Sequence, residues 1–293
     1  MTPIVFILVV LSAMLHVLWN TLIKTCTDKV SFAWLTSLAG SLVLLPIFIL
    51  CRLWAPGPLG VEVWLWAALS GLFETFYIIF LFGAYGRADL SVIYPLSRGI
   101  APLITMLLGG VLVGDTVTLP QGLIIAVICT GVAAIGYSAH TTDKKQNVWP
   151  GICFAMATGC MIAGYHLVDR KAMNISYPPN PIEYLFLMHF FLSIFITAFV
   201  TIGLKPGKQI LSEWYCNRKS VLIVGFCTPL AYFLIILALR YGNVTHVAAG
   251  RNIGIVISIL VGRLFLKEIV GRYRIIGAVL ITLGVAALLV FSS

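Results

Sequence analysis

Two arginines lie inside apolar segments of the chain, and each is followed by a hydroxyl residue. Arg98 and Thr105 are seven positions apart, and Arg251 and Ser258 repeat the same spacing. Residues seven apart share one face of a helix. A charge at the centre of a bilayer costs about 2.5–3.5 kcal/mol on insertion scales, so an arginine is seldom kept there facing lipid. The pattern favours guanidinium groups that contact an anionic substrate or a gate; the alternative is arginines that reach headgroups or hold helix ends.

Glu74 is an acidic residue in the middle of another apolar segment, and Tyr77 lies about one turn further along the same face. A carboxylate at this depth has two interpretations, which the sequence leaves open. It forms a structural ion pair with an arginine, or it accepts a proton or binds the ammonium group of a substrate.

The first apolar segment carries a polar stripe. His16, Asn20 and Lys24 stand at positions i, i+4 and i+8, with Trp19 beside them. These residues either line a site or have structural roles. In the structural interpretation Lys24 reaches the membrane interface, and His16 and Asn20 form hydrogen bonds to neighbouring helices. His16 is, with Glu74, a candidate for proton coupling. Other candidate site residues are polar or aromatic residues of later segments: Tyr94, Tyr165, His166, Tyr232 and Asn252.

The composition requires that lipid surrounds most of the chain. Of the 293 residues, 60% are hydrophobic and 10% are charged, and the mean hydropathy is +1.05. A soluble domain has about 25% charged residues. Cytosolic enzymes, nucleic-acid-binding proteins and disulfide-rich secreted domains are thereby excluded. The seven cysteines show no metal-binding spacing and no catalytic motif occurs, so we expect no metal, no cofactor and no enzymatic activity.

Ten apolar segments, each long enough for a membrane helix, follow one another with short connections. The longest connection, 205–219, is basic and is expected to be a loop that partly coils along the headgroups. The expected helices span 4–23, 32–51, 63–85, 91–113, 121–138, 149–169, 182–203, 220–239, 244–266 and 275–291.

The chain contains an internal repeat. A shift of 153 residues superposes Arg98 on Arg251 and Asp115 on Glu268. Each half, 1–138 and 148–293, then holds five helices, and an odd number makes the second half inverted in the membrane. We therefore expect an all-α integral membrane protein of two inverted five-helix repeats around a central cavity, an architecture that recurs in secondary transporters.

Three short motifs carry a resemblance to a known family. The run HVLWN at 16–20, the run YPLSR at 94–98 and the pair KE at 267–268 resemble bacterial EamA-like members of the drug/metabolite transporter superfamily. In the first half, Asp115 stands at the position that corresponds to Glu268, where the family usually has Glu, so this turn departs from the family pattern. The resemblance covers both halves and implies a ten-helix carrier of small metabolites in the bacterial inner membrane, often an exporter of amino acids.

The charges indicate the cargo. Lys24, Arg98 and Arg251 make the expected cavity basic, while Glu74 and the aromatic residues leave room for an ammonium group through cation–π contact. We predict a secondary transporter of a small anionic or zwitterionic, amino-acid-like metabolite, working as an exporter, with proton coupling as one option. The alternatives are an exporter of cationic drugs and, less favoured, a membrane enzyme; a monomer and a homodimer are both compatible with the sequence.

The side of the two termini has two conflicting indications. Ten spans place both termini on one side. Lys and Arg are more frequent in the odd-numbered connections, which by the positive-inside rule places the termini outside. The family resemblance implies cytoplasmic termini instead, and we follow the family.

Overall fold

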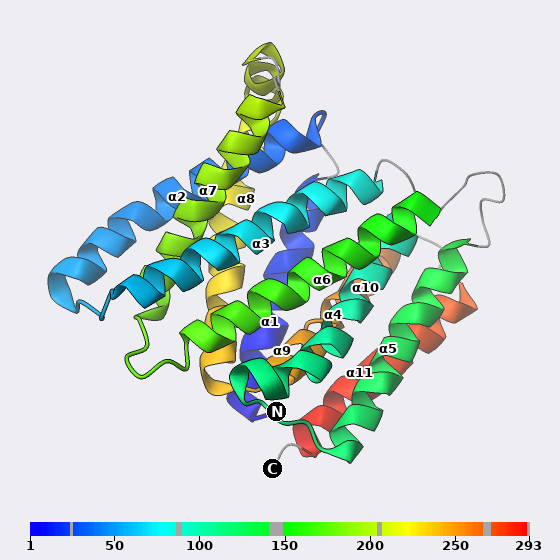
Figure 1. Cartoon of the computed structure of the whole chain (residues 1–293). Coiled ribbons are helices and arrows are strands. Elements are labelled where there is room, and N and C mark those ends of the chain that lie inside the picture. The colour runs from blue at the N-terminus through cyan, green and yellow to red at the C-terminus, as the bar shows by residue number, and fades with distance from the viewer. Residues whose placement is uncertain (24–25, 86–89, 141–148, 204–206, 266–270, 292–293) are drawn as a thin grey trace.

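The computed structural model describes residues 1–23, 26–85, 90–140, 149–203, 207–265 and 271–291, and all regular elements within them are helices. Figure 1 shows long helices that cross one another in a single bundle. Their bounds are α1 Pro3–Ile23, α2 Lys29–Trp54, α3 Val61–Tyr85, α4 Leu90–Val113, α5 Leu119–His140, α6 Trp149–Ala172, α7 Pro181–Ile202, α8 Gly207–Tyr241, α9 Val244–Gly250, α10 Ile253–Phe265 and α11 Arg272–Val290.

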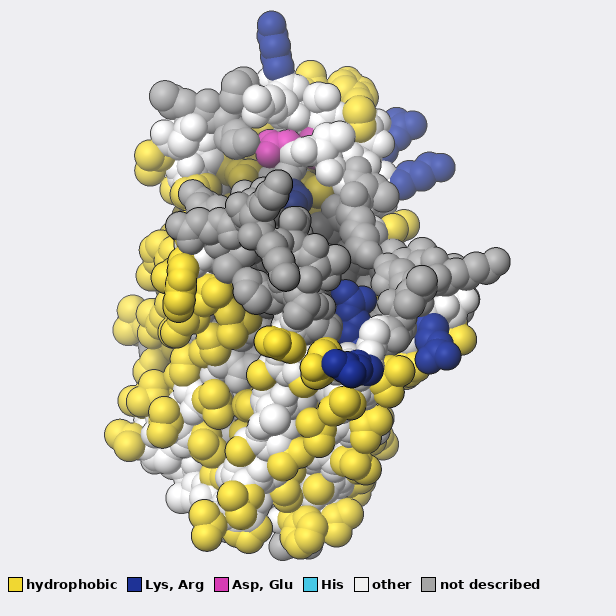
Figure 2. All heavy atoms as spheres, turned by 90° about the vertical axis from the view of Figure 1, so that its right-hand side faces the viewer, with side chains coloured by type: hydrophobic (Ala, Val, Ile, Leu, Met, Phe, Trp, Pro, Cys, Tyr) yellow, Lys and Arg dark blue, Asp and Glu magenta, His cyan; other side chains and the backbone are white. Residues whose placement is uncertain are grey.

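Nine of the ten expected segments each form one helix and the segment 244–266 forms two within the described residues, so the prediction of an all-α membrane protein is confirmed. In the described part of the chain, nine helical spans are long and apolar enough to cross a bilayer. One of these, Val244–Val261, includes both α9 and the start of α10, and α1 adds the shorter apolar stretch Pro3–Leu18. Hydrophobic side chains cover a broad area of the face in Figure 2, as a surface in contact with lipid requires.

The helices pack in equivalent pairs. Helix α3 of the first half packs on α6 of the second, and the counterpart of α3, α8, packs on α1 in the same way. The same correspondence holds for two further pairs, because α3 packs on α7 and α8 packs on α2. Two equivalent helices also pack on each other across the halves, α2 on α7 and α5 on α11. Each contact thus has a counterpart in which the two halves change places, as expected for two structural repeats related by a pseudo-two-fold axis.

The two ends of the chain lie close together at one end of the bundle (Figure 1). The amino group of Met1 donates to the carbonyl oxygen of Leu288, near the end of α11, at 2.7 Å. Both termini therefore lie on one side of the bundle, as the even number of spans requires.

The prediction of a loop at 205–219 is wrong over most of the segment. Helix α8 begins at Gly207, and a kink at Asn217, with φ −124° and ψ 17°, divides it. The reason is Glu213, whose buried carboxylate accepts the backbone N–H of Asp28 at 2.8 Å and that of Thr27 at 3.1 Å. These bonds tie the segment to the residues before α2 and satisfy the buried carboxylate.

The expected single helix across 244–266 is also wrong, because the chain breaks between α9 and α10. At the break, the N–H of Asn252 donates to Ala249 O at 3.1 Å, and the N–H of Gly254 donates to Arg251 O at 3.1 Å. Both bonds span three residues instead of the four of an α-helix. The side chain of Asn243 caps the start of α9 by accepting from the N–H of Thr245 at 2.9 Å, so the short helix has its own terminus.

Candidate functional site

Each half contributes one arginine–histidine pair to the interior. Arg98 on α4 contacts Nε2 of His16 on α1. Arg251, at the break, donates to Nε2 of His166 on α6 at 2.6 Å. Both arginines are buried, with 7% and 8% of their surface exposed. Because a guanidinium group has only donors, both imidazole Nε2 atoms must be acceptors. The two arginines, which the repeat predicted from the sequence superposes, thus each contact an imidazole.

Three of the predicted aromatic residues form a row between the halves. The ring of Tyr165 on α6 meets that of Tyr77 on α3 edge-on, with centroids 6.1 Å apart. On its other side it meets Tyr232 on α8 at 5.7 Å. The guanidinium carbon of Arg251 lies 5.9 Å from the centroid of the Tyr232 ring. The row therefore connects the first half of the chain with the arginine of the second half.

Two carboxylates lie beside this row. Glu74 on α3 interacts electrostatically with Asp169 on α6 and with Arg251. Asp169 is fully buried and accepts hydrogen bonds from the hydroxyl groups of Tyr184, at 2.7 Å, and Tyr232. The cluster thus holds carboxylates and guanidinium groups within reach of one another.

Asp169 is the residue that the sequence analysis missed. Arg170 and Lys171 follow it, and this run of charges resembles the end of a membrane helix, which we placed at 169. Helix α6 instead continues to Ala172, so Asp169 stays inside the bundle. Its position four residues after Tyr165, on the same helical face, was the signal that identifies it.

The predicted hydroxyl residues have local partners. Thr105 donates to Pro102 O at 3.1 Å, and Ser258 donates to Ile255 O at 2.8 Å. Both bonds reach back three residues within the same helix, and neither involves an arginine. The two hydroxyl groups therefore lie in equivalent positions, and both are hydrogen-bonded to backbone carbonyls.

Asn252 is fully buried, and neither its amide nitrogen nor its amide oxygen has a hydrogen-bond partner. The predicted residues of the first-helix stripe and of YPLSR cannot be placed in the same way. Lys24 lies outside the described residues, and for Trp19, Asn20 and Tyr94 the structure describes the helix but not the side chain. Their roles stay predictions.

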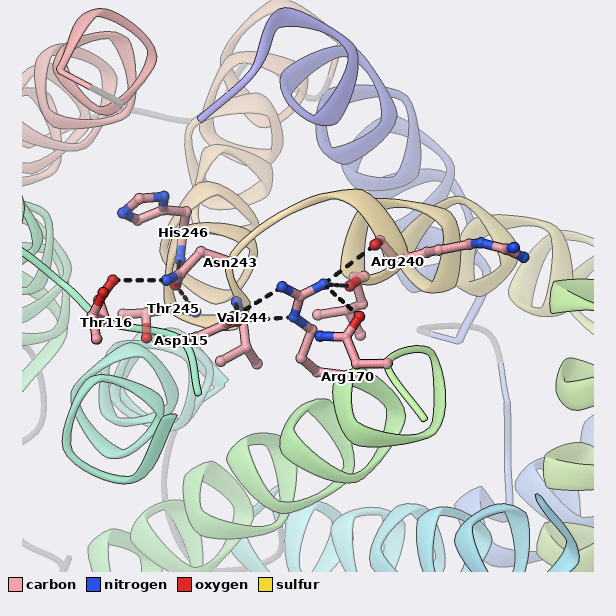
Figure 3. Close-up of polar contacts among 10 residues, drawn as sticks. Asp115, Thr116, Arg170, Arg240, Asn243, Val244, Thr245 and His246 are labelled. Atoms are coloured by element: carbon pink, nitrogen blue, oxygen red, sulfur yellow. Dashed lines mark hydrogen bonds and ion pairs between the residues drawn. The ribbon is translucent and has the colours of Figure 1, made fainter. Parts of the chain in front are cut away.

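A second polar network lies at one end of the bundle (Figure 3). Arg170 donates to both carboxylate oxygens of Asp115, from Nε at 2.9 Å and from Nη2 at 2.8 Å. Asp115 also accepts the N–H of Val244 at 2.7 Å, and Arg170 donates to Leu239 O at 2.6 Å. This network, the end clamp, joins the α4–α5 connection to the ends of α6 and α8 and the start of α9.

The central cluster suits binding of a small charged molecule. It combines guanidinium donors, carboxylate acceptors and aromatic faces, which together can hold groups of both signs. Among the described residues, no group of three His, Cys, Asp or Glu side chains could hold a metal ion.

The sequence model of the EamA-like transporter family matches the chain twice, over residues 3–137 and again over 149–290. A comparison with curated proteins finds no match. The fold is similar to those of 29 chains of solved structures. One of these, a crystal structure of a protein with 17% sequence identity, has a TM-score of 0.72 over 96% of this chain and 95% of that chain.

Proposed function

The chain belongs to the EamA-like transporter family, and from this premise we propose that it carries a small zwitterionic or anionic metabolite. Members of the family are transporters within the drug/metabolite transporter superfamily, so the chain is a multi-pass membrane protein with a small-molecule substrate. The cargo, the direction of transport and the coupling are the proposed part. We propose export across the bacterial inner membrane.

The observation that supports this cargo class is the central cluster at the junction of the halves. Arg98 and Arg251 are permanent cations, and an anionic group such as a carboxylate or phosphonate is their natural ligand. Glu74 and Asp169 bring acceptors near Arg251, and a cargo ammonium group would satisfy them. A molecule with one group of each sign fits this set better than a simple anion.

Proton coupling through Glu74 follows from competition for one carboxylate. A proton and a cargo ammonium group each neutralise Glu74, and binding of one disfavours binding of the other because either one removes its negative charge. If the proton enters as the ammonium leaves, the two movements are linked. His16 is the second candidate, although its Nε2 is occupied by Arg98.

Export of cationic drugs is the second candidate function. The aromatic row of Tyr77, Tyr165 and Tyr232, together with Glu74 and Asp169, offers a surface that also suits a lipophilic cation. The buried guanidinium groups oppose it, because an organic cation would have to approach two fixed positive charges.

Flux measurements in proteoliposomes test the proposal. The purified protein is reconstituted and assayed by counterflow with amino acids, matched carboxylates and lipophilic cations, each with and without a pH gradient. We expect saturable flux of amino-acid-like zwitterions and none of the cations. Saturable flux of cations alone would establish the second candidate, and flux of none of these solutes would overturn both.

A further inference from the structure

Asn252 is a fully buried polar side chain beside the helix break, and it has no partner. None of its surface is exposed, and both its amide nitrogen and its amide oxygen are without a hydrogen bond. Buried polar groups are nearly always hydrogen-bonded, because leaving one unpaired costs the free energy of its lost hydration. An asparagine with both ends unpaired therefore requires an explanation.

The surroundings of Asn252 are those of a ligand site. It follows Arg251 directly, at the point where α9 ends and α10 begins. Arg251 keeps helical backbone angles (φ −59°, ψ −19°), and the turn from α9 to α10 is closed by hydrogen bonds that span three residues. Such a tightened stretch inside a helix often marks a functional hinge. A second unpaired donor belongs to the imidazole that contacts Arg251, because Nδ1 of His166 is also buried without a partner while Nε2 accepts from the guanidinium group.

The chemistry of a carboxamide differs from that of the neighbouring guanidinium group. Arg251 offers donors alone, whereas Asn252 offers both a donor and an acceptor. A carboxylate can satisfy the guanidinium group and the amide N–H, but it leaves the amide oxygen unpaired. An ammonium group next to the carboxylate supplies the missing donor.

We propose that Asn252 is a specificity-determining residue of the cargo site, and that its amide oxygen accepts a hydrogen bond from an ammonium group adjacent to the carboxylate held by Arg251. The inference rests on the proposed function and adds one requirement to it: the two charged groups are on neighbouring atoms, as in an α-amino acid. A carboxylate without the ammonium group binds to Arg251 but leaves the amide oxygen of Asn252 unpaired.

The test compares pairs of solutes that differ only in the ammonium group. The pairs are L-leucine with 4-methylpentanoate, L-phenylalanine with 3-phenylpropanoate, and L-glutamate with glutarate. Counterflow of each is measured in proteoliposomes for the wild type, for Asn252→Leu, which keeps the number and branching of the side-chain heavy atoms but cannot hydrogen-bond, and for Asn217→Leu. Asn217 is the matched control because its amide already has a partner, donating to Glu213 at 2.8 Å.

We expect the wild type to prefer the amino acid of at least one pair. Asn252→Leu reduces that preference about tenfold, the effect of losing one hydrogen bond to a charged group, and it does so by lowering amino-acid flux while carboxylate flux stays unchanged. Asn217→Leu keeps the wild-type preference when flux is scaled to folded protein. Equal loss of flux for both members of every pair in Asn252→Leu would overturn the inference.

Thermal unfolding of the detergent-solubilised protein gives a second readout. Replacing an unpaired buried amide by an apolar group leaves no polar group stranded, so Asn252→Leu is expected to have a midpoint at or above that of the wild type. The preferred amino acid raises the midpoint of the wild type but not that of the variant. A lower midpoint together with an unchanged solute preference would assign Asn252 to the fold and reject the inference.

The outcomes separate the two proposals. If the wild type moves amino acids and Asn252→Leu moves them with the same preference over their carboxylate partners, only the role of Asn252 is rejected. If the wild type moves neither member of any pair, the proposed cargo class and the inference that rests on it both fail.

Discussion

Two regions of the molecule contain an arginine that is buried or nearly so, and they differ in what surrounds it. In the end clamp, Arg170 makes a bidentate pair with Asp115, and its remaining nitrogen donates to Leu239 O at 2.6 Å. At the centre, Arg251 donates to an imidazole, and the adjacent Asn252 has no partner. The charged groups of Arg170 and Asp115 are paired with each other and with backbone groups, as in a network that makes a fold rigid, although Oγ1 of Thr245 and Nε2 of His246 beside them are unpaired. Asn252 differs in that both ends of its amide are unpaired next to a charged group without a bidentate carboxylate partner, which points to a ligand. The comparison assigns structure to the first region and binding to the second.

The largest effect is expected in the clamp, and it is an effect on stability. Arg170→Gln removes one partner of a pair whose side chains are only 14% and 9% exposed. Leaving Asp115 charged and unpaired costs about 3–5 kcal/mol, which thermal unfolding of the solubilised protein would show as a large drop in midpoint. Asp115→Asn lowers the midpoint similarly, and the double variant lowers it by less than the sum, because the residues act as one unit.

The exposed Arg272 provides the control for this effect. It lies at the start of α11, and its interactions with described residues are those with its half-buried neighbour Tyr273, so Arg272→Gln should change stability by no more than about 0.5 kcal/mol. A clamp variant as stable as this control would remove the distinction between the two regions.

The central arginines should respond in the opposite way. Arg251 and Arg98 each contact an imidazole, and neither forms a bidentate pair with a carboxylate like that of Arg170 with Asp115, so Arg251→Ala and Arg98→Ala are expected to destabilise the fold less than the clamp variants do. We expect flux to fall about 100-fold, as for loss of a buried charged contact, while membrane expression and the thermal midpoint stay near wild type. Loss of folded protein in both variants would instead show that these arginines serve the fold.

Glu74 sharpens the comparison within the centre. Glu74→Gln removes the titratable charge with little change in shape, and we expect flux that no longer depends on a pH gradient, with exchange of cargo retained. Glu62→Gln is the control on the same helix, because Glu62 is exposed and its hydrogen bond within the described part of the chain comes from the indole of Trp66 at 3.2 Å. If Glu74→Gln keeps the wild-type dependence on the gradient, the carboxylate is not the coupling group.

Much of the central cluster could be predicted from the sequence, because an isolated charged residue is easily recognised within an apolar membrane segment. Arg98, Arg251 and Glu74 are visible in the sequence as isolated charges in apolar segments, and the internal repeat by itself equates the two arginines. The same reasoning fails where charges cluster. Asp169 is followed by Arg170 and Lys171, so the run resembles a helix end. In the structure, Asp169 accepts a hydrogen bond from Tyr232 in the central cluster, whereas Arg170 pairs with Asp115 in the end clamp.

The helix break escapes prediction for a related reason. Pro95 and Pro102 mark α4 as the helix with missing backbone donors, yet α4 continues from Leu90 to Val113. The break occurs in the other half, at Arg251 and Asn252, where no proline or polar run signals it. Helix α9 packs mainly against α4 and α10 mainly against α1, and tertiary packing of this kind can override local propensity.

The smallest effect is expected for the two hydroxyl groups that share a face with the arginines. Thr105 and Ser258 donate to carbonyls three residues back in their own helices, at 3.1 Å and 2.8 Å. A hydroxyl group occupied in this way contributes little to binding, so Thr105→Val and Ser258→Ala should each change flux less than about threefold, which corresponds to about 0.65 kcal/mol. Counterflow at several cargo concentrations measures this, and the two variants should give the same result because their bonds are equivalent. A loss of affinity in Ser258→Ala that Thr105→Val does not share would mean that cargo competes with Ile255 O for this hydroxyl group. The binding region would then extend along α10, and the difference between the halves would reach beyond Asn252.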